Sequence, residues 1–318
     1  MKAVVIGGSG HIGTYLIPKL VWAGYSVVNV SRGISKPYAL DLTWNEVENV
    51  TLDRTGEAPG DFERKIAALR ADIVVDLINF DVESTRGMAG ALAGTNLSHY
   101  LFCSSIWVHG TATVLPAPED LPRHPLCAYG KAKAECEAYL HHLFRTNGFP
   151  ETCILPGHIS GPGWNIINPT GNIDPGIFQR IADGAEIMLP NLGMETLNHV
   201  HADDVAQAFI NAIRHRGQAL GESFHAVSEQ SITLLGYANA MYRWFGKEPK
   251  VSFLPWDAWR KYTDDEELSD STYFHIARSG YYSIEKGKRL IEYYPRHTVL
   301  ETILESVASM AERKIITL

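Results

Sequence analysis

The chain has 318 residues, and 45 % of them are hydrophobic, which is enough to fill one large core or two modest ones. Its formal net charge of −8 disfavours nucleic acid as a partner, because surfaces that bind nucleic acid usually carry an excess of basic residues. No apolar run reaches roughly 18 residues, the N-terminus enters a strand pattern directly, and the four cysteines form no CxxC pair. We therefore expect a cytoplasmic globular protein with reduced, structural cysteines and no membrane contact.

The first half of the chain alternates apolar strand patterns with helical ones. Residues 2–6 form a short apolar run that ends in glycines, and residues 14–23 then show a helical spacing of apolar residues, although Pro18 interrupts it. Continuous apolar runs are typical of parallel strands that are buried on both faces. The alternation predicts a doubly wound parallel sheet of the Rossmann type, an α/β fold. Further strands are expected at 25–30, 50–52, 72–79, 100–103 and 153–155, and helices at 62–69 and 129–146.

A segment rich in glycine and proline, 156–176, follows the last of these strands and predicts a domain border near residue 160. Beyond it we expect a strand and a helix within 198–213, a strand at 224–227, and helices at 234–244 and 300–310. The first domain is expected to span 1–160 and roughly 196–232. A smaller, interleaved C-terminal domain that shapes a substrate pocket would then comprise 161–195 and 233–318.

The first strand runs into a glycine loop that opens the first helix. Glycines at 7, 10 and 13, with His11 and Ile12 between the last two, leave room for the backbone to approach a ligand. The amide groups of such a loop and the positive end of the helix suit a pyrophosphate. Gly7, Gly10, His11, Ile12 and Gly13 are therefore predicted to bind a nicotinamide dinucleotide.

A tyrosine and a lysine lie four residues apart at Tyr129 and Lys133, on one face of a predicted helix. A nearby cation can lower the pKa of a phenol from its usual value of about 10, so that Tyr129 exchanges a proton with a substrate hydroxyl. The same spacing occurs at Tyr15 and Tyr282, but only Tyr129 follows a strand end that bears serines, among them Ser105.

The stretches FCSSIWVHG and PEDLPRHPLCAYGKAKAECE resemble the extended short-chain dehydrogenases/reductases, the NAD-dependent epimerase/dehydratase family. The resemblance implies that Ser105 hydrogen-bonds the reacting oxygen, that Tyr129 is the catalytic acid/base, and that Lys133 binds the ribose and tunes the tyrosine. It also places Asn79 and Pro156 beside the dinucleotide.

The end of the second strand bears on the choice of dinucleotide, because an acidic residue there favours NAD and an arginine accommodates the 2′-phosphate of NADP. By resemblance, Ser31 occupies the position of the aspartate that selects NAD, and Arg32 that of an arginine in NADP-dependent relatives. Asp53 resembles the family residue near adenine. We expect NADP(H), with NAD(H) as the alternative.

The substrate is expected to be a carbohydrate. Two residues that are acidic in nucleotide-sugar 4,6-dehydratases are Ile106 and Trp107 here, and Leu197 stands where UDP-galactose 4-epimerases have an arginine for the diphosphate. His109 and His158 occupy positions that face the substrate in relatives, although a structural role is equally compatible with each. We expect a sugar, a sugar acid or a nucleotide derivative of either.

A metal site is not expected. His199, His201, Asp203 and Asp204 have side chains that can bind metals, but relatives use a similar His-x-x-Asp element for structure at the domain border.

Hydride transfer at a hydroxyl or keto group would make the protein an epimerase or a dehydrogenase/reductase, and relatives imply a homodimer through the helices that follow strands four and five. The alternative is a non-catalytic RNA-binding protein, because the stretches VSRG and DLINFDVES also resemble chloroplast stem-loop-binding proteins.

Overall fold

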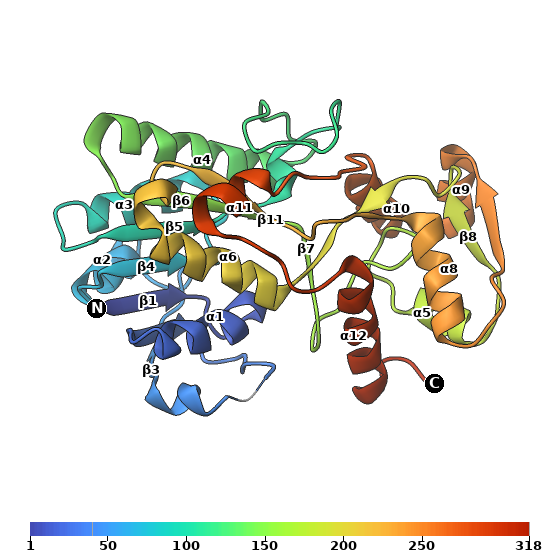
Figure 1. Cartoon of the computed structure of the whole chain (residues 1–318), viewed down its shortest axis with the longest axis horizontal. Coiled ribbons are helices and arrows are strands. Elements are labelled where there is room, and N and C mark those ends of the chain that lie inside the picture. The colour runs from blue at the N-terminus through green and yellow to red at the C-terminus, as the bar shows by residue number, and fades with distance from the viewer. Residues whose placement is uncertain (40, 318) are drawn as a thin grey trace.

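A computed structural model describes residues 1–39 and 41–317. The molecule has two lobes side by side, with the N-terminus in the larger lobe and helix α12, Val299–Glu312, between the lobes (Figure 1). Within the described ranges, no helix combines the length and the apolar character that a membrane crossing requires.

The larger lobe is built on one sheet of seven parallel strands in the order β11-β6-β5-β4-β1-β2-β3. The central strands are buried along almost their whole length, as expected for a parallel sheet with helices on both faces. The predicted doubly wound sheet is confirmed. Its strands are β1 Lys2–Ile6, β2 Ser26–Ser31, β3 Glu48–Thr51, β4 Ile73–Asp76, β5 His99–Cys103, β6 Glu151–Pro156 and β11 Ser223–Ala226.

Alternate residues of the strands feed two separate hydrophobic cores, one on each face of the sheet. Ala3 and Val5 of β1 join the core under α1, α6 and α11, whereas Val4 and Ile6 join the core under α2, α3 and α4 (Figure 1). Helix α1 continues through Pro18. The helices are α1 His11–Trp22, α2 Asp61–Ala68, α3 Val82–Leu92, α4 Ala128–Asn147, α6 Ala202–Arg214, the short α7 Arg216–Ala219, and α11 Glu285–Ile291, with 3-10 turns η1 Leu42–Glu46 and η2 Ile106–Val108.

The smaller lobe has its own hydrophobic core, drawn from residues between 166 and 316. The sequence patterns predicted α8 and α12 there but missed β8, β13, α9 and α10, because short, half-exposed elements have no long apolar period. We propose that this separate core defines the second domain. Ile284, Ile291 and Tyr293, in and beside α11, belong instead to a core of the larger lobe, so this part of the expected span 233–318 is corrected. The elements of this region are β7 His158–Ser160, α5 Gly176–Ala182, β8 Ile187–Pro190, β9 Thr196–Leu197, β10 His199–His201, β12 Ile232–Thr233, α8 Leu234–Trp244, β13 Val251–Leu254, α9 Trp256–Thr263 and α10 Glu266–Ile276.

Candidate active site

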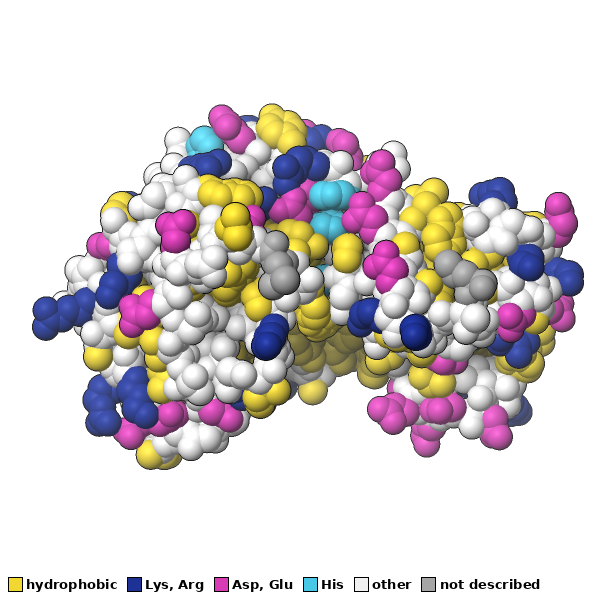
Figure 2. Space-filling model, turned by 90° about the horizontal axis from the view of Figure 1, so that it is seen from below, with side chains coloured by type: hydrophobic (Ala, Val, Ile, Leu, Met, Phe, Trp, Pro, Cys, Tyr) yellow, Lys and Arg dark blue, Asp and Glu magenta, His cyan; other side chains and the backbone are white. Residues whose placement is uncertain are grey.

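A cleft with a cavity of about 490 Å³ lies at the carboxyl ends of the sheet strands. From β1 the chain adds β2 and β3 on one side of the sheet and β4, β5 and β6 on the other, so the direction of strand addition reverses beside β1. Doubly wound sheets bind ligands at such a switch point. The cavity is lined by the loop after β1, the ends of β4, β5 and β6, the start of α4, residues 164–167 and one histidine of α10. Seen from below, the molecule is hollowed between the lobes, and the visible wall of the hollow is largely hydrophobic (Figure 2).

The glycine loop forms one end of the cleft. Gly7 has a φ of +82°, and a Cβ on Gly13 would lie 2.0 Å from the carbonyl oxygen of Gly8, so the loop and α1 can pack this closely only with glycine. Helix α1 starts at Gly10 without a side-chain cap. Its first amide groups therefore suit the pyrophosphate of a dinucleotide, and the residues present fit that group. Gly7, Gly10, His11 and Ile12 line the cavity. Gly13 lies outside this lining and packs against Gly8.

The serine, tyrosine and lysine predicted to be catalytic line this same cavity. Ser105 follows β5 and caps η2, where its Oγ accepts a hydrogen bond from the amide of Trp107 at 3.2 Å. Tyr129 lies in the first turn of α4. The helix approaches η2 closely because Gly130 has no side chain, since a Cβ there would lie 2.2 Å from the carbonyl oxygen of Trp107. This approach sets the phenol beside the serine.

Lys133 does not act on the phenol as the sequence analysis expected. Its Nζ donates hydrogen bonds to the carbonyl oxygens of Asn79 and Cys103, both at 2.6 Å, and lies 5.8 Å from the centre of the Tyr129 ring. The pKa of Tyr129 is raised to about 12, chiefly by burial, although its contact with Ser105 acts in the opposite direction. The structure therefore does not show the expected lowering of this pKa by Lys133, because desolvation of the phenol is the largest effect on it.

The residues predicted at the adenine end lie at the outer edge of the sheet, outside the lining of this cavity. The Oγ of Ser31, at the end of β2, accepts a hydrogen bond from the amide of Gly33, and Arg32 is exposed. Hydrogen bonds from Thr55 are the main cause of the lowered pKa of Asp53, and the charge of Arg32 contributes less. Asn79 is fully buried after β4, and Pro156 lines the cavity at the end of β6.

The two candidate substrate histidines have different positions. His158, on β7, lines the cavity, and neither of its ring nitrogens has a hydrogen-bond partner within residues 1–39 and 41–317. His109 is buried outside that lining, with its Nε2 2.9 Å from the Nε2 of His225. We therefore correct the expectation for His109, because its ring packs against β11 rather than facing the cavity.

The histidines and aspartates near β10 are bonded within the protein. The Nδ1 of His199 lies 2.8 Å from Ser160 Oγ, and the Nδ1 of His201 accepts a hydrogen bond from the amide of Asp203. Asp204 accepts backbone hydrogen bonds from Arg296 and His297 and lies 2.9 Å from the Nδ1 of His297. These contacts join α6 to the segment before α12, the structural role expected for this element.

His275 and Trp164 also line the cavity, and neither was predicted from the sequence. His275 lies on α10, in a region whose pattern matched no motif. Trp164 lies in the glycine- and proline-rich segment and stacks on His11, with ring centres 4.9 Å apart. No local sequence signal identified either residue.

Comparison with known proteins identifies the family of the chain. Residues 3–225 match the model of the NAD dependent epimerase/dehydratase family. The chloroplast stem-loop binding protein of 41 kDa b from Arabidopsis thaliana is 27 % identical over 315 residues, which cover 96 % of this chain and 78 % of that protein. The 2′-dehydrokanamycin reductase of Streptomyces kanamyceticus is 27 % identical over 232 residues, covering 73 % of this chain and 63 % of the reductase.

Solved structures share the fold. The UDP-glucuronic acid 4-epimerase of Bacillus cereus, crystallised in complex with NAD, superposes with a TM-score of 0.74 at 16 % identity over 98 % of this chain and 99 % of that one. The family match covers more than half of the chain and includes the glycine loop, Ser105, Tyr129 and Lys133. The chain therefore belongs to the NAD-dependent epimerase/dehydratase family, whose members include enzymes named as epimerases, dehydratases and reductases.

Proposed function

We propose that the protein transfers a hydride between a carbohydrate carbinol or carbonyl carbon and a nicotinamide dinucleotide, with Tyr129 as the acid/base. The observation that carries the proposal is that Ser105, Tyr129 and Lys133 line the same cavity as the glycine loop. When bound, the dinucleotide would supply the hydride acceptor or donor. Gly7, Gly10, His11 and Ile12 would hold its pyrophosphate, and Lys133 its ribose.

The protein groups would bind the reacting oxygen and move its proton. Ser105 Oγ would hydrogen-bond the oxygen, and the Oη of Tyr129 would give a proton to it during reduction or take one during oxidation. With its raised pKa the phenol is protonated at neutral pH, so the form present is the one that donates a proton, although a weaker acid donates less readily. Re-addition of the hydride to the other face would give epimerisation, whereas release of the keto compound would give a dehydrogenase.

Thermal-shift titration with NAD⁺ and NADP⁺ tests the central claim, because a ligand that binds only the folded state raises the melting temperature. A shift with at least one dinucleotide is expected, and no shift with either would contradict the proposal. Absorbance at the reduced-nicotinamide band, followed with a panel of sugars and sugar acids, then separates the two reaction types. Simple epimerisation leaves no net reduced dinucleotide, whereas a dehydrogenase accumulates it in proportion to the substrate consumed.

For the dinucleotide we propose NADP(H) over NAD(H), since β2 ends in Ser31 rather than an acid and exposes Arg32 beside it. Arg32→Ala should weaken NADP⁺ binding by about fivefold to tenfold and leave NAD⁺ binding unchanged, because only NADP⁺ has the 2′-phosphate. Arg64→Ala, another exposed arginine, is the matched control. Equal effects of Arg32→Ala on both dinucleotides would remove this preference.

RNA binding is the second candidate, favoured by the similarity to the stem-loop binding protein. The net charge of −8 and the intact Ser105, Tyr129 and Lys133 argue against it. Tight, salt-sensitive RNA binding that is unchanged in Tyr129→Phe, together with no dinucleotide binding, would favour RNA.

A further inference from the structure

Two histidines lie together in the cleft, and one of them has ring nitrogens for which the described residues offer no hydrogen-bond partner. His158 comes from β7 and His275 from α10, and their ring centres are 5.5 Å apart at the cavity wall. Both nitrogens of His158 are buried without a partner among the described residues. A buried polar atom without a hydrogen bond destabilises a fold, so such atoms at a cavity wall indicate a ligand.

The hydrogen-bonding capacity of the pair follows from its neighbours. The Nδ1 of His275 lies 2.8 Å from the carbonyl oxygen of Gly171, which can only accept, so Nδ1 carries the proton and Nε2 is left as an acceptor. Neutral His158 provides one donor and one acceptor. The pair therefore offers two acceptors and one donor. Hydroxyl groups can both donate to the acceptors and accept from the donor. A carboxylate or phosphate has only acceptor oxygens and would leave the two acceptors of the pair without a donor.

Burial keeps both rings uncharged, and a buried arginine close to the pair adds to its effect. Arg278 is 1 % exposed, and its Nε, Nη1 and Nη2 make no direct hydrogen bond within the described ranges; the ionisable groups that act on it are Tyr282 and Cys127. Its guanidinium lies 4.1 Å from the centre of the Trp107 ring, and Arg278 itself does not line the cavity. Burial lowers the pKa of His275 to about 4 and holds that of His158 well below its usual value, and the charge of Arg278 adds to both effects. The other groups that act on these pKa values are His199 and His275 for His158, and the hydrogen bonds with Gly171 and Ser271 for His275.

Trp107 connects this pair to the reacting end of the cleft. Its ring centre lies 5.3 Å from that of His275 and 5.7 Å from that of Tyr129, and both neighbouring rings are nearly perpendicular to it. Trp107 lines the cavity and is stacked on Arg278, which restricts its movement. An aromatic wall next to hydroxyl-binding groups suits a sugar ring, which has an apolar face and polar edges.

We propose that His158 and His275 form a subsite that binds two neighbouring hydroxyl groups of an uncharged sugar ring, packed against Trp107. The inference rests on the proposed function, because it names the substrate class for the same cleft: a neutral sugar or glycoside rather than a sugar acid or a nucleotide sugar. Arg278 is the positioning residue that stacks on Trp107, and its charge adds to the effect of burial on the two imidazoles.

Saturation-transfer NMR on the dinucleotide-loaded protein tests the subsite. The probes are methyl α-D-glucopyranoside, methyl α-D-galactopyranoside, glucuronate, glucose 1-phosphate and UDP-glucose. At least one neutral glycoside should bind more tightly than the three anions, and His158→Phe and His275→Phe should each weaken its binding about tenfold, the effect of losing one or two hydrogen bonds. His275→Gln should retain part of the affinity, and His142→Phe, at an exposed position of α4, should have no effect.

Dinucleotide affinity, measured in parallel, distinguishes the possible failures. If the wild-type protein binds neither dinucleotide, the proposed function fails. If it binds a dinucleotide but no neutral glycoside, the subsite is wrong. If UDP-glucose binds more tightly than every neutral glycoside, the proposed substrate class is wrong. The glycoside affinity of a histidine variant is compared with that of the wild-type protein only if the variant retains the wild-type dinucleotide affinity and melting temperature. If His275→Phe does not, His275→Gln is measured in its place.

The pH dependence of the imidazole signals tests the part assigned to Arg278. In the wild-type protein the Cε1–H resonances of His158 and His275 should show no protonation down to about pH 5, since each folded pKa is lowered. Arg278→Met should move both titrations upward, more for His275 than for His158, because Arg278 is the second cause of the lowered pKa of His275 and a smaller cause for His158. Unchanged titrations in Arg278→Met would contradict this role. Arg278→Lys, which keeps a positive charge, should titrate like the wild-type protein.

Discussion

The protonation state of Tyr129 is the residue-scale property on which the proposed chemistry depends. In the protein without dinucleotide, burial raises the pKa of this phenol to about 12, so the phenolate should be absent below about pH 10. Ultraviolet titration of the wild-type protein minus Tyr129→Phe should therefore show no phenolate signal in that range. A transition near pH 7 in this difference spectrum would show that Lys133 or another cation reaches the phenol.

Loss of the Tyr129 hydroxyl should remove proton transfer without removing the dinucleotide site. Tyr129→Phe should lower kcat at least about a hundredfold, the usual contribution of a general acid/base. Dinucleotide affinity should change less than about twofold, because the glycine loop and Lys133 are retained. Retention of most of the activity by a variant that still binds dinucleotide would exclude Tyr129 as the acid/base.

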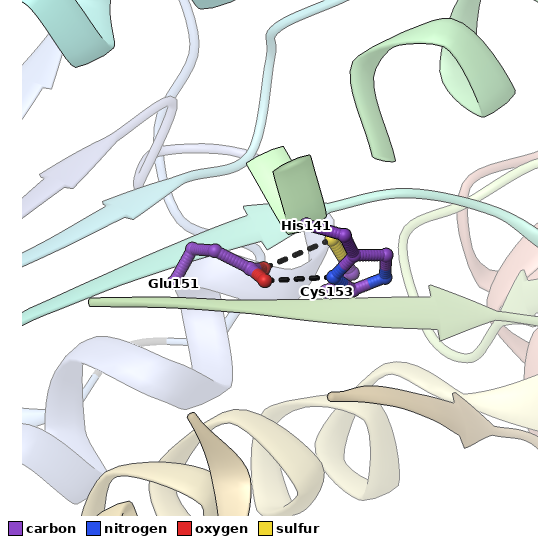
Figure 3. A group of neighbouring side chains, drawn as sticks. All are labelled: His141, Glu151 and Cys153. Atoms are coloured by element: carbon purple, nitrogen blue, oxygen red, sulfur yellow. Dashed lines mark hydrogen bonds and ion pairs between the residues drawn. The ribbon is translucent and has the colours of Figure 1, made fainter. Parts of the chain in front are cut away.

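A buried ion pair on the far side of the sheet gives a stability prediction. The Nδ1 of His141 lies 2.7 Å from a carboxylate oxygen of Glu151, which also accepts a hydrogen bond from the thiol of Cys153 (Figure 3). Glu151 raises the pKa of His141 against the opposing effect of burial. The stabilisation is therefore fully present below the unfolded value of about 6.5 and is lost as the pH rises through the folded pKa.

Glu151→Gln should accordingly lower the free energy of unfolding more at pH 5.5 than at pH 9, by about 2–4 kcal/mol at the lower pH, because it leaves a buried histidine cation without its partner. Denaturant titration at the two pH values measures this difference. His142→Gln, which changes the exposed neighbouring histidine, should show no such dependence. A larger effect at pH 9 would contradict the assigned direction of the pKa shift.

At the scale of elements, the contact between α1 and the glycine loop sets the dinucleotide site. Gly13→Ala would place a Cβ 2.0 Å from a backbone oxygen and should weaken dinucleotide binding at least about tenfold, because the loop must move away from the helix. Gly90→Ala is a matched control in α3, where no atom lies within 4 Å of the added Cβ. That variant should be stabilised by about 0.5–1 kcal/mol, the difference in helix propensity.

Thermal unfolding and a dinucleotide titration measure both glycine variants. Wild-type affinity in Gly13→Ala would show that the dinucleotide does not depend on this loop. A comparable loss in Gly90→Ala would indicate a general sensitivity of the fold.

At the scale of the whole molecule, we propose the homodimer that relatives imply, formed through α3 and α4. Leu140 of α4 is buried in the core of its own chain. Tyr139 and Leu143, also on α4, are only partly buried, so they have apolar surface that a second chain can cover. Light scattering should give twice the chain mass of 35.3 kDa, and Ala138→Arg, at an exposed position of α4, should give the single-chain mass. A wild-type mass of one chain at micromolar concentration would contradict the dimer.

The sequence by itself determined the features that depend on neighbours along the chain. The apolar strand runs, the glycine loop that opens α1, and the Tyr129–Lys133 spacing on α4 are local patterns, because strand and helix periods and backbone freedom act over a few residues. They predicted the parallel sheet, which the structure confirms, and the candidate dinucleotide site.

Only the tertiary structure decided which side chains face the cleft. His109 meets His225, 116 residues away, and His275 meets Gly171, 104 residues away, so neither ring's surroundings can be predicted from a local pattern. In the same way, backbone carbonyls 54 and 30 residues away hold the ammonium of Lys133 off the phenol. The physical reason is that burial and hydrogen-bond partners depend on segments that only the packed fold brings together, and burial is the main influence on the protonation of Tyr129, His158 and His275.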